Sequence, residues 1–97
     1  MILSFGDKTT EDVFHGLNTR NARAVPQAIW GIACRKLDFI NAASALSDLA
    51  SPPGNHLEAL RGDLRGLHSI RINSQYRIIF RWEGLGAAEV RILDYHS

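Results

Sequence analysis

Apolar residues in the first half of the chain recur at the spacing of an α-helix. The positions that set this spacing are Ile29, Ile32, Ala33, Leu37 and Ile40. Residues three and four apart share one face of a helix, so these side chains form a single apolar stripe. Pro26 precedes them and can occupy the first helical position, where its missing N–H costs nothing. The pattern predicts the principal helix over residues 26–40.

Shorter elements precede this helix. Residues 2–5 are mainly apolar and are closed by a Gly-Asp pair, which indicates a short first strand. A helix is then expected to begin at Thr9 or Thr10, because a Thr side chain can cap a helix and two acidic residues follow in its first turn. Apolar positions continue to Leu17, and the polar residues 18–24 are expected to form a loop.

The segment after the principal helix combines helical and extended signals. Asn41 can cap a further short helix in which Leu46 and Leu49 face inward, and two consecutive prolines then end it. Residues 57–60 favour a short strand that leads into the second half of the chain.

The hydrophobic period changes to that of a strand in the second half. Residues 68–73 and 76–82 alternate apolar and polar side chains, and the Ser-Gln pair between them permits a turn. A second turn at residues 83–86 leads to a last alternating stretch over residues 89–94. The pattern predicts a β-hairpin followed by a final strand.

The order of these elements defines a fold class. One strand, two or three helices and then a run of strands are typical of an α+β protein, with the helices packed on one face of a mostly antiparallel sheet. The other face of the sheet is then left open. A chain of 97 residues has room for one core, so residues 1–97 are expected to form a single domain.

Composition and charge narrow the function classes. Hydrophobic residues make up 45% of the chain and charged residues 22%, which excludes a disordered or fibrous protein. The formal net charge of +1 lacks the strong basicity of a typical nucleic-acid binder. Cys34 is the only cysteine, and the sequence has no run of about 18 apolar residues. We therefore expect a cytoplasmic protein without disulfides or membrane spans.

Arg side chains are concentrated around the predicted strands. Nine of the eleven basic residues are Arg, whose planar guanidinium binds phosphate oxygens through paired hydrogen bonds. Arg71, Arg77 and Arg81 fall on alternating strand positions, beside Arg61 and Arg65 of the preceding loop. On the open face of the sheet they would form a positively charged platform suited to phosphate. The alternative for each single Arg is an ordinary solvated charge.

The last residues, Asp94, Tyr95 and His96, carry groups that can orient or move protons. On a regular strand Asp94 and His96 share one face and Tyr95 points away, so regular geometry does not bring all three to one site. Taken alone, such a tripeptide is more often a solvated chain end than a catalytic motif.

No metal or nucleotide-cofactor site is expected. The four His residues are scattered without the helical spacing of four, and a single cysteine cannot build a zinc site. No glycine-rich loop follows a predicted strand, so nothing supports a nucleotide cofactor.

Three segments together resemble a known family. They are residues 52–62 (PPGNHLEALRG), 69–80 (SIRINSQYRIIF) and 94–96 (DYH). In their order and spacing the chain resembles HigB-type toxins of the RelE superfamily over nearly its whole length. The resemblance implies a RelE-like microbial ribonuclease fold, cleavage of messenger RNA at the ribosome, and neutralisation by a helix-turn-helix HigA-type antitoxin. Operator DNA would be bound only through the complex with that antitoxin.

The resemblance also implies roles for individual residues. Arg77 falls on the family's phosphate-binding Arg, and Arg61 on a basic position of its Leu-Lys/Arg-Gly element. Asp94, Tyr95 and His96 match the terminal motif of the family. His96 is then the expected general acid or base, Asp94 its counterpart or orienting group, and Tyr95 a residue that stacks on a base or bonds the RNA backbone.

One position departs from the family pattern. Some members place a catalytic His where this chain has Glu58, and His56 stands two residues earlier, on what we expect to be the same strand face. Glu58 and His56 are therefore candidate substrate-binding residues, together with Arg71 on the adjacent strand.

The implied reaction is an in-line attack by the RNA 2′-hydroxyl on the neighbouring phosphorus, which requires a base, an acid and cations but no metal. Two alternatives remain open. The first is a ParE-like toxin that inhibits DNA gyrase by binding, although the terminal Asp-Tyr-His argues against it. The second is a degenerate member that only binds its antitoxin.

Overall fold

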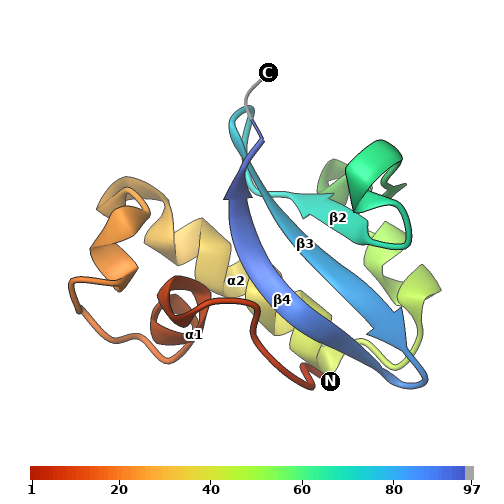
Figure 1. Cartoon of the computed structure of the whole chain (residues 1–97), viewed down its shortest axis with the longest axis horizontal. Coiled ribbons are helices and arrows are strands. Elements are labelled where there is room, and N and C mark those ends of the chain that lie inside the picture. The colour runs from red at the N-terminus through yellow and green to blue at the C-terminus, as the bar shows by residue number, and fades with distance from the viewer. Residues whose placement is uncertain (96–97) are drawn as a thin grey trace.

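The computed structural model describes residues 1–95. Within this range it contains the helices α1 (Lys8–Phe14) and α2 (Trp30–Ala42) and the strands β1 (Glu58–Ala59), β2 (His68–Arg71), β3 (Tyr76–Glu83) and β4 (Gly86–Asp94). Neighbouring strands pair antiparallel in the order β1-β2-β3-β4 (Figure 1). Short 3₁₀ helices lie in the connections, at Ala22–Ala24, Gln27–Ile29, Leu46–Ala50, Pro53–Asn55 and Gly62–Leu64. The predicted α+β class is confirmed.

Alternation along the strands divides their side chains between two faces of the sheet. Ile78 on β3 stands opposite Ile70 on β2, and both are fully buried. They belong to one apolar cluster with Ala33, Leu37 and Ile40 of α2, which lies behind β3 and β4 in Figure 1. Arg77 and Ile79 occupy the opposite face because successive strand residues point to opposite sides. The predicted hairpin is confirmed.

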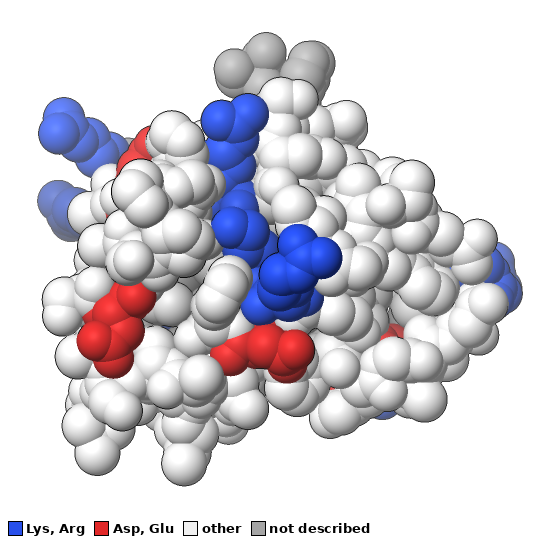
Figure 2. Space-filling model, turned by 180° about the vertical axis from the view of Figure 1, so that it is seen from behind, with Lys and Arg blue, Asp and Glu red and all other residues white. Residues whose placement is uncertain are grey.

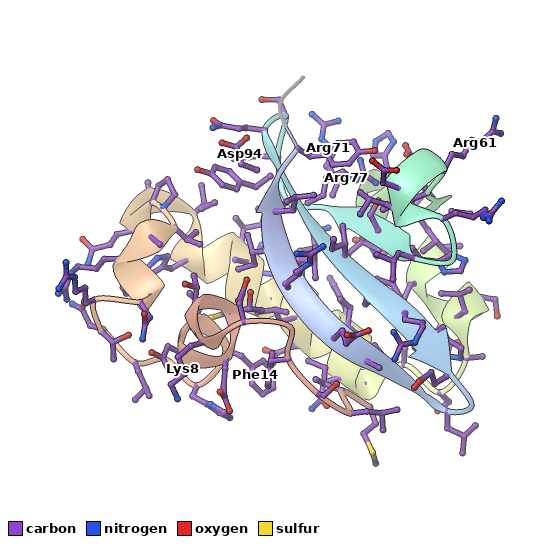
Figure 3. The ribbon with its side chains drawn as sticks, viewed as in Figure 1. Lys8, Phe14, Arg61, Arg71, Arg77 and Asp94 are labelled. Atoms are coloured by element: carbon purple, nitrogen blue, oxygen red, sulfur yellow. The ribbon has the colours of Figure 1, made fainter. Side chains whose placement is uncertain are left out.

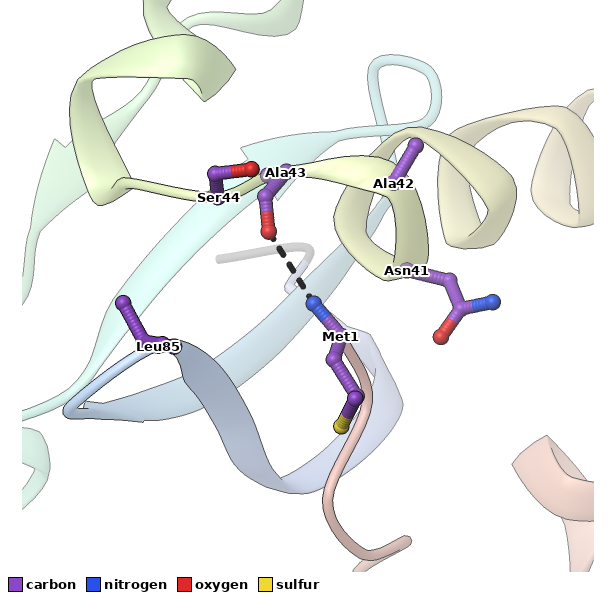
Figure 4. A pocket seen from close by; sticks show the side chains of 6 residues that line it. All are labelled: Met1, Asn41, Ala42, Ala43, Ser44 and Leu85. Carbon is purple, nitrogen blue, oxygen red and sulfur yellow. Dashed lines mark hydrogen bonds between the residues drawn. The ribbon is translucent and has the colours of Figure 1, made fainter.

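The N-terminal segment runs beside β4 but does not form a regular strand. Isolated parallel bridges join Ile2 to Ala87 and Phe5 to Val90. The bridged positions are three residues apart, so residues 2–5 form two isolated bridges in place of the short first strand that the sequence indicated. The Met1 amine donates a hydrogen bond of 3.0 Å to the Ala43 carbonyl, across a hollow at the end of α2 (Figure 4).

Helix α1 is capped by a different side chain from the one predicted. The Asp7 carboxylate accepts a 2.8 Å hydrogen bond from the N–H of Thr10. Asp is a better N-cap than Thr, which explains why the helix begins ahead of Thr9. The helix ends at Phe14, and Leu17 is 46% exposed instead of facing the core.

The principal helix is confirmed with shifted ends. Asn41 lies inside α2 and caps no further helix; its Oδ1 accepts from the N–H of Ile2 at 2.9 Å. The predicted short helix is the 3₁₀ helix Leu46–Ala50, whose start is held by the Asp48 carboxylate. Among the described residues, neither α-helix has the length and apolar character needed to cross a membrane.

A buried carboxylate ties α1 to the loop that follows it. Asp12 is 1% exposed, accepts a 2.6 Å hydrogen bond from the Thr19 hydroxyl and lies 3.3 Å from the Lys8 ammonium. The hydroxyl donor, followed by Lys8, lowers the pKa of Asp12 below its ordinary range. Both contacts favour the ionised carboxylate.

The lowered pKa predicts that acid weakens the fold through Asp12. Its stabilisation is present above the unfolded pKa of about 3.9 and is lost as the pH falls through the lower folded value. Urea unfolding between pH 6 and pH 2.5 should show a smaller acid-dependent loss of unfolding free energy for Asp12→Asn than for the wild type. Parallel pH curves for the two proteins would contradict this assignment.

Candidate functional site

Arg77 on β3 is the most deeply placed basic side chain in the described part of the sequence, at 8% exposed. Its Nε donates to the Ser69 hydroxyl at 2.7 Å, and its Nη2 donates to the His56 carbonyl at 2.5 Å. Its Nη1 lies 3.9 Å from the Glu58 carboxylate, which is 54% exposed. An exposed carboxylate at this distance offsets the charge of the Arg77 guanidinium only weakly. The electrostatic potential at Arg77 therefore stays positive.

Tyr95 completes the surroundings of this guanidinium. The Arg77 guanidinium carbon lies 5.8 Å from the centre of the Tyr95 ring, within the range of a cation–π contact. Tyr95 itself is 42% exposed, so its ring is also available to solvent and to a ligand. We call Arg77, Ser69, His56, Glu58 and Tyr95 the Arg77 site.

A second guanidinium lies beside the Arg77 site. Arg71 on β2 stands directly opposite Arg77 in the strand register, and its Nε donates to the Asn73 carbonyl at 3.0 Å. Figure 3 shows both side chains near the same end of the hairpin. Like charges directly opposite in a sheet repel each other. An anion bound between them would relieve that repulsion, which favours a phosphate here.

A buried amide holds the loop that supplies the His56 carbonyl. Asn55 is fully buried, donates from its amide to the carbonyls of Leu49 and Ser51 at 3.2 and 3.3 Å, and accepts from the Lys36 ammonium at 2.5 Å. Burial lowers the pKa of Lys36. His56 follows with a positive φ of 46°. The network thus fixes the backbone that bonds Arg77.

The backbone conformation of His56 differs from the predicted one. Strand β1 is confined to Glu58–Ala59, and His56 ends the preceding 3₁₀ helix in a left-handed conformation. The expectation that His56 and Glu58 share one strand face is therefore wrong. His56 contributes its carbonyl oxygen to the Arg77 site instead of a strand-borne imidazole.

The side chains of Asp94, which ends β4, and of the next residue, Tyr95, lie on opposite faces of the sheet. Asp94 pairs in register with Tyr76 and accepts from the Gln75 amide at 3.1 Å, whereas Tyr95 lies against Arg77. Figure 3 places Asp94 on the opposite side of the hairpin from Arg71 and Arg77. This agrees with the alternation expected for a regular strand. His96 lies outside the described residues.

Arg61 and Arg81 do not join the Arg77 site. Arg61 is exposed at the start of the 3₁₀ helix Gly62–Leu64, and Figure 3 shows it on a separate loop. Arg81 is paired with the carboxylates of Glu83, at 3.3 Å, and Glu89. The uniform positive platform predicted for the sheet is therefore wrong at Arg81, because acidic neighbours compensate its charge.

Positive charge also gathers on the side of the molecule that carries α2. Figure 2 shows Lys and Arg side chains in a band on that side, with acidic side chains next to one end of it.

Over residues 1–95, no group of three or more His, Cys, Asp or Glu side chains is arranged to hold a metal ion.

Sequence reasoning missed three residues that support Arg77. Ser69, Asn55 and Lys36 make the hydrogen bonds that fix its guanidinium or the adjacent loop. Ser69 was an ordinary polar strand position, and Lys36 lay on a helix far from it in sequence. The only available signal was the Asn that follows Pro-Pro-Gly, since Asn favours turns that use its side-chain amide.

A small α+β fold with a buried Arg near the end of its antiparallel sheet is consistent with the RelE-like class of toxins. Residues 3–96 match the family of HigB-like toxins, described as RelE-like toxins of the type II toxin–antitoxin system HigB. The chain belongs to this family, as the sequence resemblance indicated.

Two further proteins are similar to this chain, and the first is a toxin of the same type. The chain is 44% identical over 97 residues to toxin HigB-1 of Vibrio cholerae serotype O1, covering all of this chain and 99% of the relative. It is also 44% identical over 73 residues to an uncharacterized protein of Haemophilus influenzae, covering 75% of this chain and 71% of that protein.

Proposed function

We propose that this toxin is a ribosome-dependent endoribonuclease that cleaves messenger RNA. The observation that carries the proposal is the Arg77 guanidinium, which is buried, held by Ser69 and His56, and in cation–π contact with Tyr95. A cation fixed in advance stabilises charge that develops on a phosphate without reorganising during the reaction. Only two of the five guanidinium N–H donors are used by hydrogen bonds within residues 1–95, so donors remain for an anion.

The proposed reaction uses the substrate's own nucleophile. The RNA 2′-oxygen attacks the adjacent phosphorus and loses its proton to a general base. The bond from phosphorus to the 5′-oxygen breaks, and a general acid protonates that oxygen. The products are a cyclic phosphate and a 5′-hydroxyl end. Arg77 would bind the non-bridging oxygens, where negative charge grows, and Arg71 is placed to share that role.

The other candidate residues take supporting roles in this proposal. Tyr95, half exposed over Arg77, can stack on a base of single-stranded RNA. Asp94 would orient the proton-transferring group at the chain end. Glu58 at the Arg77 site and Arg61 on its separate loop would contact the RNA strand. His56 would do so in addition to its carbonyl bond to Arg77.

His96 is the proposed proton-transferring residue, because an imidazole with an ordinary pKa of about 6.5 changes charge near neutral pH. His96→Ala is expected to reduce RNA cleavage by about 10²–10⁴-fold, the usual contribution of general acid–base catalysis. Growth arrest on induction should disappear, while binding to the antitoxin is retained. Unchanged growth arrest by His96→Ala would remove His96 from the mechanism.

The partners follow from the family and the charge. A toxin of a type II system has an antitoxin as its partner, and we propose a helix-turn-helix protein of the HigA type that also carries the complex to operator DNA. The near-neutral charge of +1 supports a toxin that relies on the ribosome to position its RNA, since free RNA is held largely by electrostatic attraction.

The test compares one defined message in two forms, bound to ribosomes and naked, each treated with toxin released from its antitoxin. We expect new 5′-hydroxyl ends on the ribosome-bound message and at least about tenfold slower cleavage of the naked one, since the near-neutral toxin gains little from electrostatic attraction to free RNA. Equal rates on both forms would contradict ribosome dependence. DNA breaks in induced cells without RNA cleavage would instead indicate a gyrase-directed toxin.

A further inference from the structure

The chain has two lysines, Lys8 and Lys36, and they lie in different surroundings. Lys8, at the start of α1, has a side chain that is 63% exposed and that pairs with the carboxylates of Glu11 at 3.6 Å and Asp12 at 3.3 Å. Lys36, on α2, is half-buried, and its amine forms no ion pair with a carboxylate within residues 1–95. Lysine amines are common targets of acylation, so the two surroundings predict different reactivities.

The surroundings act on the protonation of each amine, and only an unprotonated amine is a nucleophile. The hydrogen bond and charge of Asp12, followed by the charge of Glu11, raise the pKa of Lys8, which keeps this amine protonated. Burial lowers the pKa of Lys36, and the positive charge of the neighbouring Arg35 lowers it further. Lys36 is therefore the lysine with the larger unprotonated fraction.

The Lys36 amine lies between a buried amide and a partly exposed ring. It donates to the Asn55 Oδ1 at 2.5 Å, and in the described part of the chain it makes no other hydrogen bond. It also lies 5.6 Å from the centre of the ring of Phe39, a residue that is 38% exposed. Arg35, the residue before it, is exposed and has no ion pair within residues 1–95, so its charge can attract an anion to this point.

We propose that Lys36 is a site of acylation by an acyl phosphate, and that this modification weakens the toxin. The unprotonated amine of Lys36 attacks the acyl carbon, so that a C–N bond forms and the bond from that carbon to the phosphate oxygen breaks. Inorganic phosphate leaves and takes up the proton that the nitrogen loses. Arg35 would bind the phosphate group of the donor during this step, as guanidinium groups commonly bind phosphate.

The effect on the toxin follows from the hydrogen bonds around Asn55, and it rests on the proposed cleavage at Arg77. Acylation removes the charge of Lys36, so the charge-assisted hydrogen bond to Asn55 is lost or becomes a weaker neutral one. The acyl group also needs space beside this fully buried amide. His56 follows Asn55 directly, and its carbonyl accepts the Nη2 hydrogen bond of Arg77 at 2.5 Å. Lys36 is thus a positioning residue, and its acylation displaces a partner of Arg77.

The first test treats the full-length toxin, released from its antitoxin, with acetyl phosphate and follows acetylation of Lys8 and Lys36 by peptide mass spectrometry. Lys36 should react at least about fivefold faster, because opposite shifts of the two pKa values multiply in the ratio of unprotonated amines. In urea-unfolded toxin the two rates should become nearly equal. Arg35→Met should slow the reaction at Lys36. Equal rates in the folded toxin, or a preference for Lys36 that persists in urea, would overturn the proposal.

The second test measures cleavage of a ribosome-bound message before and after the same treatment. Treatment should slow cleavage by the wild type about tenfold, within the loss of up to about 10²-fold that a displaced positioning group causes. Lys8→Arg, the matched control, should respond like the wild type. Lys36→Arg, which keeps the positive charge and offers no amine, should show the same rate before and after treatment.

A spectroscopic measurement separates displacement of Arg77 from general damage. On acetylation of the ¹⁵N-labelled wild type, the Nε–H signal of Arg77 should shift, whereas that of Arg81, which is paired with carboxylates on the same strand, should stay in place. Full cleavage by toxin acetylated at Lys36, or an equal loss in treated Lys36→Arg, would overturn the regulatory role. Selective acetylation with the Arg77 shift, in a toxin that cleaves no RNA before treatment, would reject the proposed function but support the modification site.

Discussion

Arg77→Ala is expected to abolish growth arrest and to slow RNA cleavage by about 10²–10³-fold, the effect of removing one preorganised donor to a developing anion. The guanidinium is held by the Ser69 hydroxyl and the His56 carbonyl, so its remaining donors are already directed before RNA binds. Arg77→Lys is expected to lose most of the activity as well, because a single ammonium cannot bond both fixed partners and a phosphate in the planar geometry of Arg.

A control variant separates this effect from a general loss of positive charge. Arg81 lies on the same strand, but it is exposed and paired with Glu83 and Glu89, so Arg81→Ala should leave cleavage within a few-fold of the wild type. Circular dichroism and antitoxin binding would establish that each variant is folded. A folded Arg77→Ala toxin that still arrests growth would show that Arg77 does not bind the reacting phosphate.

Asn55→Ala is expected to lower the unfolding free energy by about 3 kcal/mol, since unsatisfied buried polar groups cost about 1–3 kcal/mol each. The substitution removes the donors to the Leu49 and Ser51 carbonyls and the acceptor of the Lys36 ammonium. It also releases the loop whose His56 carbonyl bonds Arg77, so cleavage should fall in the fraction that remains folded.

Asn18→Ala is the matched control, because Asn18 is exposed and, within residues 1–95, its side chain bonds only that of Arg23. Its effect should stay within about 0.5 kcal/mol, the usual range for surface substitutions. Urea unfolding of both variants gives the comparison. Equal stabilities of Asn55→Ala and Asn18→Ala would contradict the structural role of the buried amide.

The strand region was predictable from sequence because a period of two assigns each side chain to a face. The alternation predicted that Arg77 and its neighbour Ile78 lie on opposite faces of the sheet, with Ile78 facing the core. It also predicted that Asp94 and Tyr95 lie on different faces, and the structure agrees on both points. Alternation does not predict how deeply a side chain on the open face is buried. Arg77 is buried because the His56 carbonyl, 21 residues earlier, lies against it, and that contact depends on the folded loop.

The less regular parts were predicted less well for local reasons. Thr9, Thr10 and Asp7 can each cap a helix by their side-chain oxygen. Asp is the better N-cap, and α1 begins after Asp7. His56 was assigned to a strand because residues 57–60 favour one, but its left-handed conformation turns the chain before β1 begins. The compensation of Arg81 by Glu89 depends on the irregular register between β3 and β4, which no sequence period encodes.

RNA cleavage organised around Arg77 can be tested by mapping 5′-hydroxyl ends across the transcripts of cells that express either the wild-type toxin or Arg77→Ala. We expect new 5′-hydroxyl ends within translated messages for the wild type and none above background for Arg77→Ala at equal protein level. The same ends from both proteins, or growth arrest by the wild type without any new ends, would contradict it.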